Sequence, residues 1–186
     1  MRKCEWLVLA IVVAVFIAAC GRSRQPEPEL RPTATIKDIM DSLVDPSADA
    51  LWESVATVVT ASGTDERAPK TDEDWANVRR HAIRLIEATN LLLMDGRHVA
   101  NPADKSENPN IELEPAQIET LIAQDPAAWI KFTHGLHDAA VPALKAIDAK
   151  NAADLLNAGE GIDVACENCH LKYWYPNTQQ AAAAKK

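Results

Sequence analysis

The stretch AADLLNAGEGIDVACENCHLKYWYP, residues 152–176, decides the fold. Its apolar or small residues recur at alternating steps of three and four, which places them on one helical face at about 100° per residue. That face carries Ala152, Leu155, Gly159, Ile162, Cys166, Cys169 and Tyr173, and Pro176 ends the run. The spacing predicts a long amphipathic helix, which needs other helices against which to bury its stripe.

Three further stripes of the same period precede this one. The first covers about residues 35–60 and is interrupted by Asp45-Pro46, where proline lacks an N–H and crowds the preceding turn. The second begins after Thr71, a helix-capping residue type. The third begins at Asp125-Pro126 and bends near Pro142. The fold class predicted is all-α, an antiparallel four-helix bundle with kinked first and third helices and no strand.

The composition agrees with one mainly helical domain of ordinary size. The chain has 186 residues, of which 47% are hydrophobic and 5% aromatic, whereas strands favour aromatic residues. A polar connection of residues 95–115 and a short helical segment of residues 115–124 separate the second and third long helices. The net charge of −8 argues against nucleic acid as a partner, because phosphate binding needs a basic surface.

The N-terminus has the pattern of an export signal. Arg2 and Lys3 precede an uncharged run, residues 6–19, which is too short to span a bilayer. The run ends in Ile17-Ala18-Ala19-Cys20, which resembles a bacterial lipobox, in which the cysteine takes a lipid. The alternative is an ordinary signal peptide with an incidental cysteine. We therefore expect a signal peptide (1–19), a lipidated N-terminus and flexible tether (20–33), a four-helix domain (34–176) and a disordered tail (177–186), with the protein anchored by Cys20 to a membrane in the periplasm.

The motif that carries chemistry is Cys166-Glu-Asn-Cys169-His170. Two thiols at i and i+3 lie about 5–6 Å apart on one helix face and can capture the two vinyl groups of a haem. His170 projects from the same face and can be an axial iron ligand. From this chain's composition, C-x-x-C-H is expected by chance roughly 0.002 times. The alternative is a zinc site that His134 and His137 would complete.

Residues 34–175 resemble the class II c-type cytochromes, the cytochrome c-prime group and its methionine-ligated low-spin relatives. The resemblance rests on C-x-x-C-H near the C-terminus of an alanine-rich helical chain and on Tyr173, three residues after the histidine. It implies one covalent haem c, held by Cys166, Cys169 and His170. Trp174 stands where the family usually has an arginine, and the lipobox is also a departure from the usual soluble member.

Helix geometry ranks the candidates for the other side of the iron. At 1.5 Å per residue, His170 and Met40 lie at similar heights, ~8 and ~9 Å from one end of the bundle. Met40 also lies on the apolar stripe of its helix, whereas Met94 and His134 are turned away from theirs. Met40 is therefore the predicted sixth ligand, although methionine is also a common core residue.

Two functions follow from these alternatives. A His/Met-ligated iron suits an electron carrier, not an enzyme, whose redox partner protein would have a basic docking surface. If Met40 only packs in the core, the iron is five-coordinate and binds a gas such as nitric oxide or carbon monoxide. A lipoprotein without haem is a third alternative, and the sequence leaves open a homodimer.

Overall fold

The computed structural model describes residues 29–176. The chain divides into two units, Met1–Arg31 and Pro32–Lys186, and the described part of the first contains an exposed ion pair between Arg31 and Glu29. The predicted signal peptide, Cys20, most of the tether and the predicted tail lie outside the described residues. None of the described helices combines the length and the apolar character that crossing a bilayer requires.

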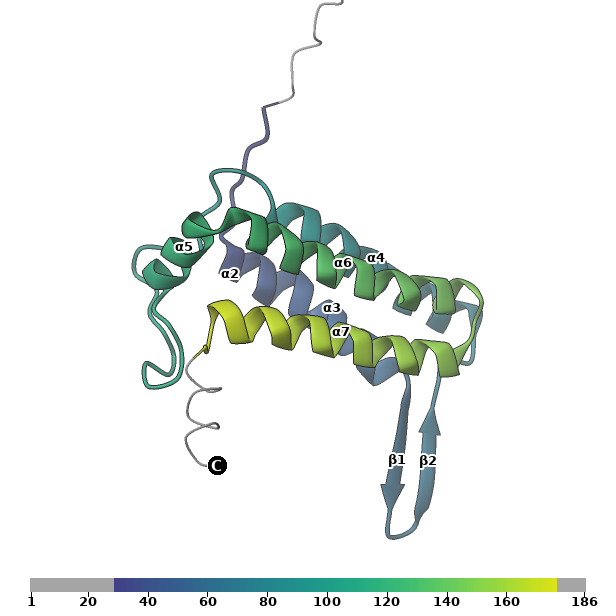
Figure 1. Ribbon diagram of the computed structural model, residues 1–186. Coiled ribbons are helices and arrows are strands. Elements are labelled where there is room, and N and C mark those ends of the chain that lie inside the picture. Colours follow the sequence, from purple (N-terminus) through teal and green to yellow (C-terminus); the bar gives the residue numbers. More distant parts are fainter. Residues whose placement is uncertain (1–28, 177–186) are drawn as a thin grey trace, which may run out of the picture. The chain divides into compact units, whose positions relative to one another are not determined.

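The second unit is a bundle of four helical rods (Figure 1). The first rod contains α2 (Ile36–Ile39), η1 (Met40–Val44) and α3 (Asp45–Ser54). The other three are α4 (Asp72–Leu92), α6 (Pro126–Asp148) and α7 (Ala152–Tyr173), and the short α5 (Pro115–Gln124) precedes α6. Each rod packs against the next along the chain, and α7 returns to α3. The predicted antiparallel four-helix bundle is confirmed.

Side-chain caps fix where the long helices begin. The Thr71 hydroxyl accepts a hydrogen bond from the Asp74 N–H at 3.1 Å, and the Asp74 carboxylate accepts one from the Thr71 N–H at 2.9 Å. The Asp125 carboxylate accepts a hydrogen bond from the Ala128 N–H at 3.0 Å. Such caps satisfy N–H groups that have no partner within the helix. The predicted starts of the second and third long helices are therefore confirmed.

The core lies along the bundle axis. Leu51, Leu85, Leu155 and Ile162 are fully buried, one or two from each of three rods. Ala140 and Ala143 supply small fully buried positions on α6, which allow close approach of the neighbouring helices. Burial of each large aliphatic side chain contributes about 1.5–3 kcal/mol. The buried stripe accounts for the stability of the bundle.

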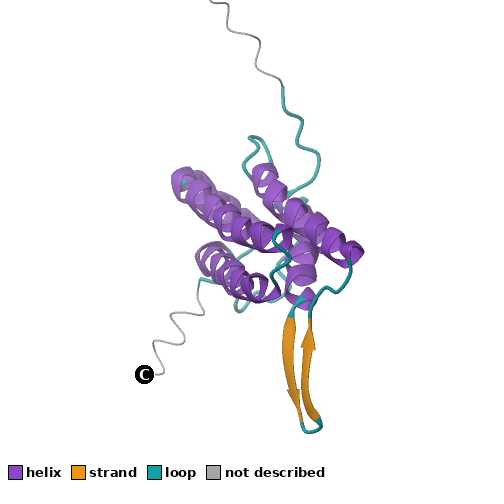
Figure 2. Cartoon of the chain, turned by 90° about the vertical axis from the view of Figure 1, so that its right-hand side faces the viewer, coloured by secondary structure: helices purple, strands orange, loops and turns teal. Residues whose placement is uncertain are grey.

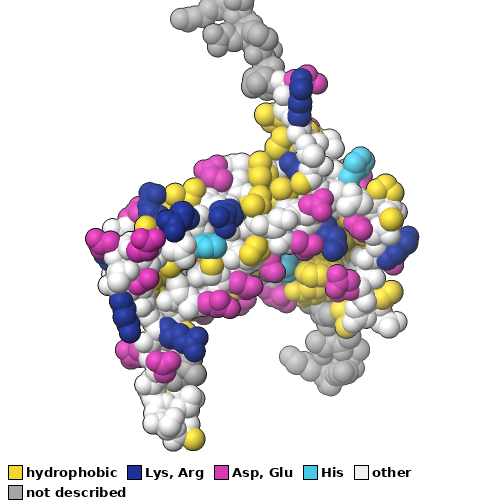
Figure 3. Space-filling view, turned by 180° about the vertical axis from the view of Figure 1, so that it is seen from behind, with side chains coloured by type: hydrophobic (Ala, Val, Ile, Leu, Met, Phe, Trp, Pro, Cys, Tyr) yellow, Lys and Arg dark blue, Asp and Glu magenta, His cyan; other side chains and the backbone are white. Residues whose placement is uncertain are grey.

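Charged side chains of both signs are interspersed over the outside of the helices, as the face drawn in Figure 3 shows. Arg79 Nε on α4 lies 2.7 Å from Asp148 Oδ1 on α6, and Lys150 Nζ lies 2.6 Å from Asp72 Oδ1. These pairs link neighbouring rods, but they are exposed, so solvent and salt screen the attraction between their charges. The outer charges add little to the stability that the core provides.

The first rod is irregular in the turn directly before Asp45-Pro46. A π-helical turn, η1, occupies the five residues before Asp45-Pro46, and the Asp45 N–H donates to the Met40 carbonyl. The wider turn accommodates the ring of Pro46, which cannot donate the hydrogen bond that a regular helix needs there. α6, in contrast, continues without interruption through Pro142.

A β-hairpin replaces the last predicted turn of the first helix. Strands β1 (Ala56–Thr60) and β2 (Gly63–Arg67) pair in antiparallel register from Ala56 opposite Arg67 to Thr60 opposite Gly63, and the hairpin projects away from the helices (Figure 2). The prediction of helix to Thr60 and of no strand is wrong. Four consecutive β-branched residues, 57–60, favour a strand, and Gly63 takes a φ of +138° that other residues rarely adopt.

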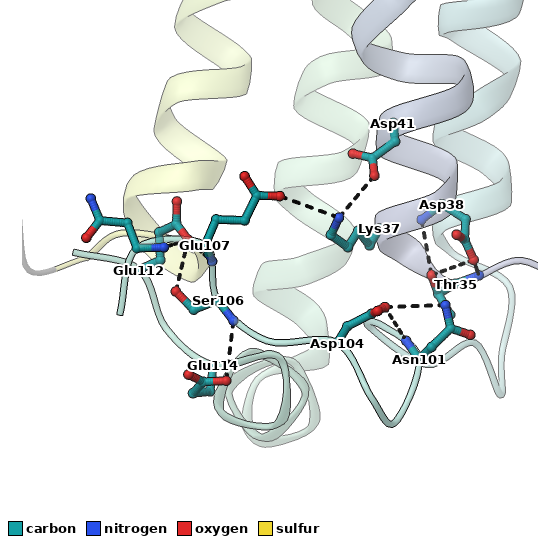
Figure 4. A network of polar contacts seen from close by, with 11 residues as sticks. Thr35, Lys37, Asp38, Asp41, Asn101, Asp104, Ser106, Glu107, Glu112 and Glu114 are labelled. Atoms are coloured by element: carbon teal, nitrogen blue, oxygen red, sulfur yellow. Dashed lines mark hydrogen bonds and ion pairs between the residues drawn. The ribbon is translucent and has the colours of Figure 1, made fainter. Parts of the chain in front are cut away.

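The long connection between α4 and α5 is bound to the start of the first rod. The N–H groups of Ile36 and Lys37 donate to the carbonyls of His98 and Val99, both at 2.9 Å. Glu112 orders the same connection, because its carboxylate accepts hydrogen bonds from the Ser106 hydroxyl and from two backbone N–H groups (Figure 4). The connection is therefore an ordered wall at one end of the bundle.

Candidate functional site

Helix α7 brings the three residues of the C-x-x-C-H motif to one face near its C-terminal end. The Asn151 side chain caps the helix by accepting a hydrogen bond from the Asp154 N–H at 3.1 Å. Cys166, Cys169 and His170 are all half-buried, and both cysteines are free. Two of the three pack against the buried core. The structure therefore presents two unpaired thiols and an imidazole together, as the spacing predicts.

Burial controls the protonation of all three groups. It raises the pKa of the Cys166 thiol to about 11, with a smaller contribution from Asp163 and Asp45, and that of Cys169 to about 12. Burial also lowers the pKa of His170, against a weaker opposite effect of Glu167 and Asp45. At neutral pH the thiols are protonated and the imidazole is neutral, which is the form that binds a metal. Protonated thiols also argue against a reactive dithiol site.

An aromatic group lies directly beyond the motif. Tyr173 is 3% exposed, and its ring makes edge contacts with Trp129 at 5.4 Å and Phe132 at 5.8 Å. The Tyr173 hydroxyl is buried and has no hydrogen-bond partner within residues 29–176. A buried hydroxyl of this kind normally has a partner. Its position fits a polar group bound beside the cysteines.

The register of α3 against α7 places Met40 level with His170. The Trp52 indole N–H donates to the Gly159 carbonyl at 3.0 Å, which fixes where the two antiparallel helices meet. From that point Met40 is 12 residues back along the first rod, and His170 is 11 residues on along α7. At 1.5 Å per residue these are about 18 and 16 Å in the same direction. Met40 is half-buried and packs against the core.

The motif end of α7 has different neighbours from the start of the first rod. α7 packs mainly on α6, then on α3 and α5, whereas α2 and η1 pack on α3 and α4. Trp52 can approach α7 closely because Gly159 has no side chain, and a Cβ there would lie 3.0 Å from the indole ring. Free thiols, a neutral imidazole and a buried Tyr173 hydroxyl with no partner among the described residues lie near the end of α7, and these groups fit a covalent haem.

The other candidate ligands are not brought to the motif. His134 is exposed, His137 pairs with Asp138 at 3.2 Å, and residues 29–176 hold no group of His, Cys, Asp and Glu that could bind a metal ion. The described residues therefore give no support to the zinc alternative. The Met94 sulfur accepts a hydrogen bond from Arg97 Nη2 at 3.2 Å, so it is already engaged in the connection.

Several residues near the motif were not predicted as site residues. Asp45 was interpreted only as part of a helix interruption, yet its charge acts on Cys166 and His170. Trp174 makes an edge contact with the His170 ring at 5.0 Å, and its carbonyl accepts a hydrogen bond from the Leu113 N–H at 2.8 Å. Tyr175 lies between His170 and Glu167. Only its closeness to the motif in the sequence could have pointed to Tyr175.

Comparison with protein-family models finds no match, and neither does comparison with curated proteins. Solved structures do show a similarity. One is the nitric oxide complex of a leucine-to-valine mutant of cytochrome c prime from Alcaligenes xylosoxidans, with 18% identity, a TM-score of 0.46, and coverage of 77% of this chain and 98% of that chain. Another, titled cytochrome c', has 20% identity, a TM-score of 0.47, and coverage of 76% and 98%. The likeness is distant, and the assignment of function rests on this chain's own residues.

Proposed function

We propose that the domain binds one covalent haem c through Cys166, Cys169 and His170. The observation that carries the proposal is that α7 presents two free thiols and a neutral imidazole on one half-buried face near its C-terminal end. The bound haem would supply one-electron redox chemistry and an iron able to bind small gases. The mass of the exported chain tests the proposal.

Each residue of the motif has a separate role. Cys166 and Cys169 would each hold the haem through a thioether, since addition of S–H across a vinyl double bond places the proton on carbon and loses no atom. His170 would ligate the iron from the same helix face, one residue beyond Cys169. Tyr173, Trp129 and Phe132 form an aromatic wall next to Cys169. These side chains hold the group in place and keep water from one side of it.

Met40 is the proposed sixth ligand, which would make the protein an electron carrier. Its level matches that of His170, and it begins the π-helical turn η1, an irregularity that is frequent at functional sites. Methionine ligation keeps the iron six-coordinate in both oxidation states and raises the reduction potential.

A gas-binding protein with an open sixth position is the second candidate. The similar solved structures include nitric oxide complexes of cytochrome c prime, which agree better with this candidate than with electron transfer. In this alternative Met40 is part of an apolar wall. The oxidised spectrum separates the two candidates, because a methionine ligand makes the iron low-spin.

We further propose that the protein is exported to the periplasm and anchored there by a lipid on Cys20. Wild-type protein is expected to stay with the membrane fraction after salt washing, and Cys20→Ser is expected to be released, because the tether contains too little apolar surface to bind a bilayer. Cys4→Ser is the matched control and should behave as the wild type. A Cys20→Ser protein that still sediments with membranes, together with a wild type that has no lipid at its N-terminus, would contradict the anchor.

An acidic rim beside the motif supports the proposal of a redox partner with a basic surface. Asp45, Asp163 and Glu167 are exposed, and each is close enough to act on the motif residues. Electron exchange with a basic small cytochrome should slow about tenfold as salt rises from low to physiological ionic strength, because salt screens the attraction. Asp45→Asn with Asp163→Asn should weaken this salt dependence. Asp65→Asn, on the distant hairpin, should leave the salt dependence unchanged. Equal effects of the two changes would contradict the proposal that the acidic rim binds the redox partner.

A further inference from the structure

Tyr175 lies directly after α7 and connects His170 to a carboxylate. Its hydroxyl donates to Glu167 Oε2 at 2.7 Å and lies 3.5 Å from His170 Nδ1. Glu167 and His170 are neighbours on one face of α7, three residues apart. The three side chains therefore form a chain that runs from the carboxylate through the hydroxyl to the imidazole.

The backbone holds Tyr175 in this position. The N–H groups of Trp174 and Tyr175 both donate to the His170 carbonyl, at 2.7 and 3.0 Å. The bond from the Leu113 N–H to the Trp174 carbonyl attaches this turn to the ordered connection before α5. The Tyr175 ring also contacts the rings of His170 and Trp174, with centroids 5.8 and 5.5 Å apart. Tyr175 is thus fixed from two sides.

The two contacts of the Tyr175 hydroxyl favour one tautomer of His170. A tyrosine hydroxyl has one proton to donate, and the shorter contact shows that this proton points to Glu167. Toward His170 the oxygen can then only accept, which requires a proton on Nδ1. A neutral imidazole with Nδ1 protonated has its lone pair on Nε2. That nitrogen is the one left free for iron.

We infer that Tyr175, supported by Glu167, is a positioning residue for the axial imidazole. It orients the His170 ring with Nε2 toward the metal and, because the carboxylate polarises the hydroxyl, it strengthens the electron donation of the imidazole to iron. The inference rests on the proposed haem site. It concerns Tyr175 and Glu167, which are not themselves proposed to bind the haem or its iron.

The test compares Tyr175→Phe with its parent in a Met40→Ala background, where the ferrous iron should be five-coordinate and the iron–histidine stretching band can be measured by resonance Raman spectroscopy. Loss of the hydroxyl should move the band to lower wavenumber and should raise the reduction potential, because the imidazole donates less. Glu167→Gln should shift the Raman band and the reduction potential in the same directions, but by smaller amounts. The double variant should match Tyr175→Phe, because Glu167 acts through the hydroxyl.

Glu160→Gln is the matched control, since it removes one exposed carboxylate from the same helix two turns before Glu167. It should leave the Raman band in place. A Tyr175→Phe protein that carries its haem and shows the parent's band and potential would overturn the inference alone. A chain that carries no haem mass in any variant would overturn the proposed function, and the inference with it. Helical circular dichroism of each variant separates these results from unfolding.

Discussion

Replacement of both Cys166 and Cys169 by alanine is expected to remove the haem mass from the mature chain completely. Expressed with a working cytochrome maturation system, the wild type should carry the full mass of one haem, because addition of two thiols loses no atom. The double variant has no thiol at the site and cannot form either thioether. Mass spectrometry of the denatured chain distinguishes covalent from merely bound haem.

Single variants and a histidine control sharpen this result. Cys166→Ala and Cys169→Ala should each retain one thioether and, with it, the haem mass. His134→Ala together with His137→Ala should leave the haem in place, because those histidines do not reach the motif. A wild-type chain that has no haem mass, or that binds zinc through the cysteines, would remove the central proposal.

Met40→Ala should convert the iron from six- to five-coordinate while the haem remains attached. In the oxidised wild type we expect a low-spin spectrum with a methionine–iron charge-transfer band near ~695 nm. The variant should lose this band and bind carbon monoxide readily in the ferrous form. The physical reason is the shared level of Met40 and His170, both measured from the contact of Trp52 with Gly159.

Met94→Ala is the matched control for this experiment. The Met94 thioether is bound to Arg97 in the connection after α4, so its loss should leave the band near ~695 nm unchanged. If the wild type is already high-spin, or if Met40→Ala has the spectrum of the wild type, then Met40 is only a packing residue. The gas-binding candidate would then take first place.

The sequence was sufficient to predict the features that depend on short-range spacing. The period of α7 placed its two cysteines and histidine on one face, and Thr71 and Asp125 marked the first turns of α4 and α6. Each of these depends on residues no more than four positions apart. The four-helix bundle could also be predicted, because four amphipathic helices have few other ways to bury their apolar faces.

The errors arose where one pattern fitted two structures. Val58 continues the helical spacing of the first stripe, but it also belongs to a run of β-branched residues, and the hairpin formed. The interruption at Asp45-Pro46 was predictable, but its form was not: a π-helical turn in the five residues before it accommodates the proline ring. Tyr175 and Asp45 could not be assigned to the site, because their roles depend on the end of α7 and on the packing of α3 against it.

The contact of Trp52 with Gly159 sets how closely α3 and α7 approach each other. The two helices touch where a glycine admits an indole ring, and the motif lies about 16 Å farther along α7. A side chain at position 159 would meet the ring at 3.0 Å and push the helices apart at this contact. A substitution at position 159 is therefore expected to alter the separation of α3 and α7, although Gly159 is neither of the proposed iron ligands.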